Sequence, residues 1–218
     1  MSRRHQKGAT ARRASRPTGA SGSRAATLVG RLKHLHEIAD VGEIARRYFP
    51  MNAFDGVLTG LGIITGSYFA SVRDVRTVVS VVAAASVSLG VSGFYGSYLS
   101  EQAERARELK ELEETTLYGL ESTDIGAASR YATFAIATVA GLSSALGGLI
   151  LCVGLALYPV VGVETSFYLA WGLAVAELFL LGAFLSRVSR GRMLVSAAKL
   201  ILAGGVAFGL SLLLNAPA

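Results

Sequence analysis

Long apolar runs alternate with short polar segments along this chain. The apolar runs cover residues 53–71, 77–99, 131–157, 166–186 and 193–214. An α-helix rises 1.5 Å per residue, so the first run alone extends about 28 Å, close to the hydrocarbon thickness of a bilayer. The pattern predicts an all-α integral membrane protein, with about five transmembrane helices in a domain at 51–218.

The second run continues without a helix breaker into a charged stretch. We therefore expect the second helix to extend beyond the membrane as far as residue 116, within a cytosolic segment at 100–130. Gly119 and Gly126 lie in the last part of this segment, and glycines between periodic segments are typical of turns. Residues 118–130 are therefore predicted as a polar loop.

Before the first span, residues 26–50 carry apolar side chains at helical spacing between charged ones. This pattern predicts an amphipathic helix lying on the membrane interface, ended or kinked by Pro50. Residues 1–25 hold lysine and arginine but no acidic residue, and we expect a disordered basic tail there. No apolar segment of a secretory signal follows, while an organellar transit peptide stays open as an alternative.

Charge is sparse and uneven, with 17% charged residues and a net charge of +6 that comes mainly from the tail. We expect this basic excess to face an anionic membrane surface, and no nucleic acid. The tail, 101–130 and the turn at 187–192 are predicted to share the cytosolic side, although Arg73 and Arg76 on the opposite side count against this orientation.

Three ionisable residues lie inside the predicted spans: Asp55, Glu177 and Lys199. A charge at the bilayer centre costs a few kcal/mol, so each is expected to have a partner or a task. Asp55 could capture a cation near the cytosolic end of its span or cap a helix. Glu177 and Lys199 could form a buried ion pair that fixes helix register, or a proton relay.

A second acidic group lies on the predicted extension of the second helix, where its members recur every three or four residues: Glu101, Glu104, Glu108 and Glu111. Carboxylates on one helix face suit divalent cations such as Mn²⁺ or Fe²⁺. The alternative is a solvated face, stabilised by the i,i+4 pairs Glu101–Arg105, Arg107–Glu111 and Lys110–Glu114.

Glycines in the first and last spans predict close helix packing: Gly56, Gly60, Gly62, Gly66, Gly204, Gly205 and Gly209. Residues 90–93 fit the GxSG pattern of rhomboid-type intramembrane serine proteases. All three histidines precede the first span, so Ser92 has no general base, and we expect no enzyme.

The first span, FDGVLTGLGIITG at 54–66, resembles the DG-x-x-T-x-x-G-x-x-x-G first helix of the vacuolar iron transporter family. GSYLS at 96–100 stands in the place of the family's GEY-x-S, and LGA at 181–183 and ILAGG at 201–205 resemble its last helices. The resemblance covers residues 50–214 and includes the number of spans.

This resemblance implies a five-helix protomer, a homodimer with the ion path at its two-fold interface, and proton-coupled export of Fe²⁺ or Mn²⁺ from the cytosol. Asp55 matches the family's pore aspartate, whereas Ser97 replaces its second-helix glutamate and Gly93 replaces a usual methionine. Thr59 and Ser97 are then expected to complete the transport path beside Asp55.

Two functions follow from these patterns. The first is a transporter that takes Fe²⁺ or Mn²⁺ as substrate and holds no permanent cofactor, in the cell membrane of a prokaryote or a vacuolar or organellar membrane of a eukaryote. The second is a non-transporting membrane scaffold or sensor of the same fold, which would tolerate the loss of the glutamate and the methionine.

Overall fold

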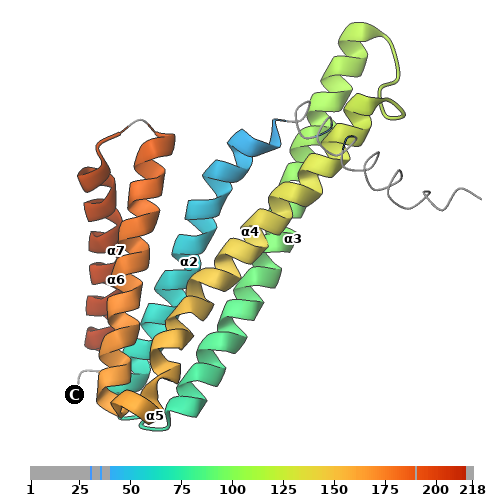
Figure 1. Cartoon of the computed structure of the whole chain (residues 1–218). Coiled ribbons are helices and arrows are strands. Elements are labelled where there is room, and N and C mark those ends of the chain that lie inside the picture. Colours follow the sequence, from blue (N-terminus) through green and yellow to red (C-terminus); the bar gives the residue numbers. More distant parts are fainter. Residues whose placement is uncertain (1–29, 31–34, 36–39, 190, 215–218) are drawn as a thin grey trace, which may run out of the picture. The chain divides into compact units, whose positions relative to one another are not determined.

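The computed structural model describes residues 30, 35, 40–189 and 191–214, and the regular elements in that part are all helices. They are α2 (Val41–Phe69), α3 (Val75–Thr116), α4 (Asp124–Ala156), α5 (Tyr158–Val161), α6 (Val163–Val188) and α7 (Met193–Leu214), shown in Figure 1. The predicted basic tail at 1–25, and most of the predicted interfacial helix before residue 40, lie outside the described residues.

Four helical segments of the described part are long and apolar enough to cross a membrane: α3, α4 together with α5, α6, and α7. The prediction of an all-α, multi-pass membrane protein is confirmed at this level. α2, which contains the first expected span, is not among the four. α2 is less apolar than the neighbouring helices because it contains several glycines and threonines and Asp55. Val57 and Ile64 on α2 are nevertheless fully buried against those neighbouring helices.

α2 runs without interruption through Pro50, so the predicted boundary between an interfacial helix and the first span is not a helix end. Proline has no N–H to donate to the carbonyl of Arg46, one turn earlier, but its ring is compatible with helical φ. Pro50 is buried. Residues 41–49 and the first expected span therefore form a single helix.

α3 is one helix of 42 residues, about 63 Å long, and it continues through the acidic stretch to Thr116. α4 begins at Asp124, so the prediction of a loop over 118–130 is wrong from that residue onward. Ala128 explains the difference: it is 1% exposed, in a small apolar cluster with Val41 and Ile136. We call residues 100–130 the charged hairpin.

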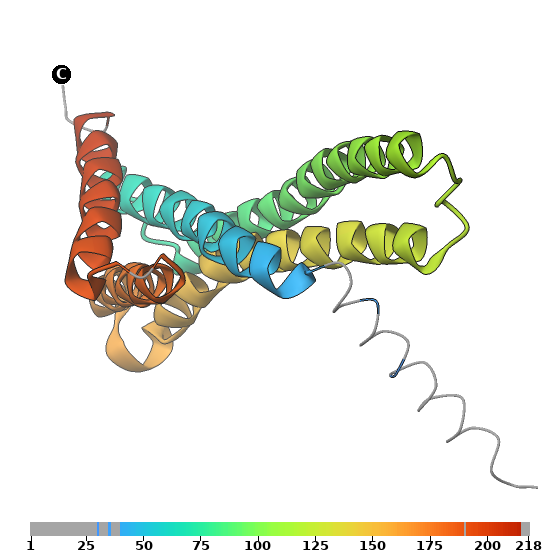
Figure 2. The ribbon, with the colours of Figure 1, turned by 90° about the horizontal axis from the view of Figure 1, so that it is seen from above.

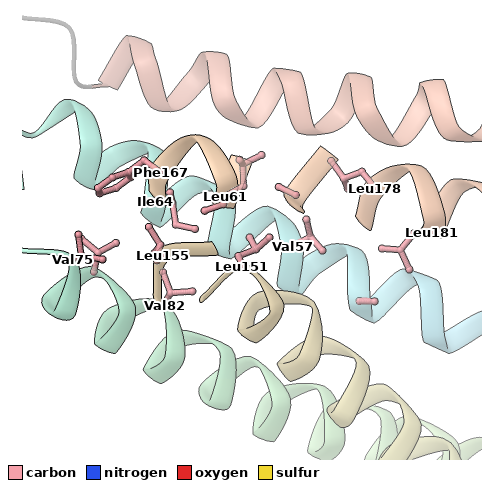
Figure 3. Close-up of a cluster of buried hydrophobic side chains, with 14 residues drawn as sticks. Val57, Leu61, Ile64, Val75, Val82, Leu151, Leu155, Phe167, Leu178 and Leu181 are labelled. Carbon is pink, nitrogen blue, oxygen red and sulfur yellow. The ribbon is translucent and has the colours of Figure 1, made fainter. Parts of the chain in front are cut away.

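The main core joins four helices through apolar side chains, drawn in Figure 3. Val57 and Ile64 of α2, Leu151 and Leu155 of α4 and Phe167 of α6 are all fully buried there. Seen from above, α2 lies between the α3–α4 pair and the α6–α7 pair (Figure 2). The central position of α2 explains why Val57, Ile64 and Thr65 on this helix are fully buried.

Glycine and serine allow α2, α3 and α4 to approach one another closely. A Cβ built on Gly56 would lie 2.1 Å from the carbonyl oxygen of Ser144, and one on Gly148 would lie 2.1 Å from Oγ of Ser86. The packing role predicted for Gly56 is thus confirmed. Gly205 and Gly209 have no such neighbour within 4 Å in the described part, so their predicted role is not seen within the protomer.

An aromatic cluster ties α2 to α6 where α2 ends and α6 begins. Tyr68 packs edge to face on Phe167 and Trp171, and Trp171 Nε1 donates a hydrogen bond of 3.2 Å to Oγ1 of Thr65. At the other end of the same helix pair, Phe49 packs on Phe184. The two helices are therefore antiparallel and touch near both ends of the pair.

Candidate ion-binding site

Asp55 lies on the exposed side of α2, far from either end of the helix. The helix begins at Val41, about four turns earlier, so the alternative that Asp55 caps a helix is wrong. Asn52 is also inside the helix, and its Nδ2 donates to the carbonyl of Tyr48 at 2.9 Å. Among the described residues the Asp55 carboxylate accepts no hydrogen bond and forms no ion pair, so it is available to a ligand.

Met51, Asp55 and Thr59 follow one another at four-residue spacing and therefore share one side of α2. Met51 is 69% exposed and Thr59 is partly exposed. A thioether, a carboxylate and a hydroxyl thus line one accessible stripe. Met51 was not singled out from the sequence, because it stands before the predicted start of the span and belongs to no family motif.

Ser97, the third residue of the predicted transport path, is not brought beside Asp55. α2 and α3 are antiparallel, and a Cβ on Gly93 would lie 3.4 Å from Oδ1 of Asn52. Ser97 is buried one helical turn beyond Gly93 on α3, which brings it beside the part of α2 between Asn52 and Tyr48. Asp55 lies about one turn from Asn52 toward the other end of α2, away from Ser97. Within a protomer, the predicted Asp55–Ser97 pairing is therefore not formed.

Glu177 and Lys199 do not form the predicted ion pair in the described structure. α7 packs on α6 through Ala197 and Gly204, since a Cβ on Gly182 would lie 2.4 Å from Cα of Ala197. Lys199 is two residues beyond Ala197, about 200° around the helix, and is exposed. Glu177 is half-buried, and its Oε2 has no hydrogen-bond partner among the described atoms.

The acidic side chains of the charged hairpin do not gather into a metal site. No group of three His, Cys, Asp or Glu side chains in the described residues is arranged to hold a metal ion. Glu104, Glu108 and Glu111 are exposed, and Arg107 Nε lies 2.9 Å from Oε1 of Glu111. The solvated-face alternative describes these three residues better than the ligand prediction does.

Glu101 differs from them, because it lies against α2. Its Oε2 is 3.4 Å from Nε of Arg105, and both side chains are only 12% exposed. The pKa of Tyr48 is raised above its ordinary value mainly by burial, and to a smaller extent by the neighbouring Glu101 carboxylate. Glu101 therefore joins α3 to α2 and is engaged by groups of the protein itself.

Comparison with known proteins returns no matching family model, no matching curated protein and no matching solved structure. The fold and the site define a class only: a multi-pass helical membrane protein with two carboxylates, Asp55 and Glu177, that lack partners in the described part of the chain.

Proposed function

We propose that the chain is a membrane transporter of divalent transition-metal cations, with Fe²⁺ or Mn²⁺ as substrate. The observation that carries this proposal is the position of Asp55, which is exposed in the middle of a core helix with no polar partner among the described residues. A carboxylate left facing lipid would cost a few kcal/mol. A cation path, lined by a second copy of the chain, removes that cost.

The side chains around Asp55 support a transition metal over Mg²⁺ or Ca²⁺. Met51 offers a soft sulfur and Thr59 a neutral oxygen on the same side of α2. Thioether ligands favour transition metals, whereas the hard cations take oxygen ligands alone. In a homodimer, two copies of this stripe would supply six donors without the glutamate that Ser97 replaces.

The same proposal includes five spans for each protomer. α2 accompanies α6 from the Phe49–Phe184 contact to the Tyr68–Phe167 contact, so it extends through the same layer as a helix that can cross a membrane. The charged hairpin and the α6–α7 turn lie at one end of the bundle, opposite α5 (Figure 1). We assign that end to the cytosol because it carries most of the basic residues.

A non-transporting scaffold or sensor remains the second candidate, favoured by the lack of any three-ligand cluster in the described protomer. Expression in a host strain that lacks its own iron exporter separates the two functions. The transporter restores growth at toxic Fe²⁺, and Asp55→Asn at equal membrane abundance does not. Equal rescue by Asp55→Asn, or no rescue by the wild-type chain, would instead favour the scaffold.

A further inference from the structure

A pocket of about 460 Å³ opens between the first turns of α2 and the last turns of α6. Its lining combines two arginines, one glutamate and two apolar side chains: Glu43, Arg46, Phe184, Arg187 and Val188. None of these residues belongs to the ion-binding site around Asp55, which lies further along α2.

The two arginines reach this pocket from different helices. Arg46 Nε donates to the carbonyl of Gly42 at 2.8 Å, which orients the guanidinium and leaves its terminal nitrogens available. Neither Arg46 nor Arg187 forms an ion pair with any described residue. The two guanidinium groups outnumber the single carboxylate of Glu43 in the lining, so the pocket favours an anion, and their planar donors match the oxygens of a phosphate group.

The apolar part of the lining indicates where that phosphate comes from. Phe184 packs edge to face on Phe49, with ring centroids 5.4 Å apart, and this contact holds α2 against α6 beside the pocket. Arg187 and Val188 follow directly on the apolar run of α6, so we place the pocket at the level where lipid headgroups would meet the hydrocarbon. Basic pockets between helices at this depth suit anionic lipid headgroups.

The carboxylate of Glu43 in the lining indicates which kind of anionic headgroup the pocket can accept. This carboxylate adds one negative charge beside the two arginines, which disfavours a ligand with several phosphate charges but can accept a hydrogen bond from a hydroxyl. We propose that this pocket binds the headgroup of an anionic glycerophospholipid that carries a single phosphodiester charge and free hydroxyls, of the phosphatidylglycerol type.

Native mass spectrometry of the purified full chain in detergent, titrated with phosphatidylglycerol or phosphatidylcholine, tests this proposal. We expect preferential retention of phosphatidylglycerol. Arg46→Gln or Arg187→Gln should each weaken it about tenfold, the loss expected for one charge-assisted contact. Arg47→Gln is the matched control, since Arg47 is the exposed neighbour on the same helix and does not line the pocket.

Glu43→Gln keeps the proposal testable even if an arginine variant folds poorly, because it should strengthen phosphatidylglycerol binding and allow a lipid with more phosphate charge to compete. Melting curves of the protein recorded with the lipid, with inorganic phosphate or with glycerol phosphate show whether the pocket binds a lipid headgroup or a free phosphate. Stabilisation by the lipid alone supports the proposal. Equal stabilisation by the soluble phosphates, equal weakening in Arg47→Gln, or no change in Glu43→Gln would overturn it.

Discussion

The carboxylates of this protein fall in two regions with opposite surroundings. In the charged hairpin, the acidic side chains lie near arginines at helical spacing, as in the Arg107–Glu111 pair, whose side chains are 72% and 63% exposed. In the helices that pack into the core, Asp55 and Glu177 have no such partner among the described residues. The hairpin carboxylates without an ion pair, such as Glu104 and Glu108, are exposed on helix ends beyond the apolar runs, whereas Asp55 and Glu177 lie within apolar runs.

This contrast shows why a count of acidic residues is a poor guide to a metal site here. An exposed i,i+4 pair contributes only a few tenths of a kcal/mol and is at home in water. An unpaired carboxylate in an apolar environment opposes folding and membrane insertion, so its presence calls for a ligand or a task. For the proposed transport function, the difference favours Asp55 on α2, and not the hairpin, as the position that takes the cation.

The largest effect on stability is expected where the core helices touch backbone to backbone. Gly56→Ala places a methyl group against the carbonyl of Ser144 and should lower the free energy of unfolding by about 2–3 kcal/mol. Gly119→Ala in the hairpin meets nothing within 4 Å and should change it by less than about 0.5 kcal/mol. Melting in detergent compares the two variants, and equal losses would contradict the packing described here.

A smaller effect, of opposite sign, is expected at Glu177. Glu177→Leu removes a buried oxygen without a described hydrogen-bond partner and should stabilise the protein by about 1–2 kcal/mol. Combined with Lys199→Leu, the effects should add within about 0.5 kcal/mol, because the two residues are not paired. A strong coupling between them in a double-mutant cycle would restore the ion pair that the sequence predicted.

The smallest effect concerns Tyr48, where the two regions meet. Because its pKa is raised in the folded state, its contribution to stability is present below the unfolded pKa of about 10 and is lost as the pH rises through the folded value. Wild type should lose stability above about pH 10 more steeply than Tyr48→Phe. Parallel melting curves of the two proteins between pH 8 and pH 11 would show that Tyr48 does not titrate in this way.

Much of the fold could be predicted, because apolar runs of membrane length leave few alternatives. The predicted last span has the bounds of α7, Met193–Leu214, and the predicted third span, 131–157, lies within α4 except for its last residue. The early start of α4 could not be predicted, since it depends on Ala128 packing against Val41, far away in the sequence. Local composition there, with Gly126 nearby, is typical of a loop.

The candidate site was only partly predictable. Asp55 stands out in any sequence as an acid within an apolar run, but its exposure on the protomer depends on which side of α2 its neighbours cover. The predicted Glu177–Lys199 ion pair is wrong because sequence spacing indicates how far along its helix each residue lies, but not toward which side its side chain points. Only the Ala197 contact with Gly182 shows that Lys199 points elsewhere.

Mn²⁺ flux into proteoliposomes tests most directly which region carries the chemistry. The comparison is between wild type, Asp55→Asn, and a variant in which Glu104, Glu108 and Glu111 are all changed to glutamine. We predict that Asp55→Asn lowers the flux at least about tenfold, the effect of losing one charged ligand, while the triple variant stays within about twofold of wild type. Undiminished flux in Asp55→Asn together with loss of flux in the triple variant would contradict the account.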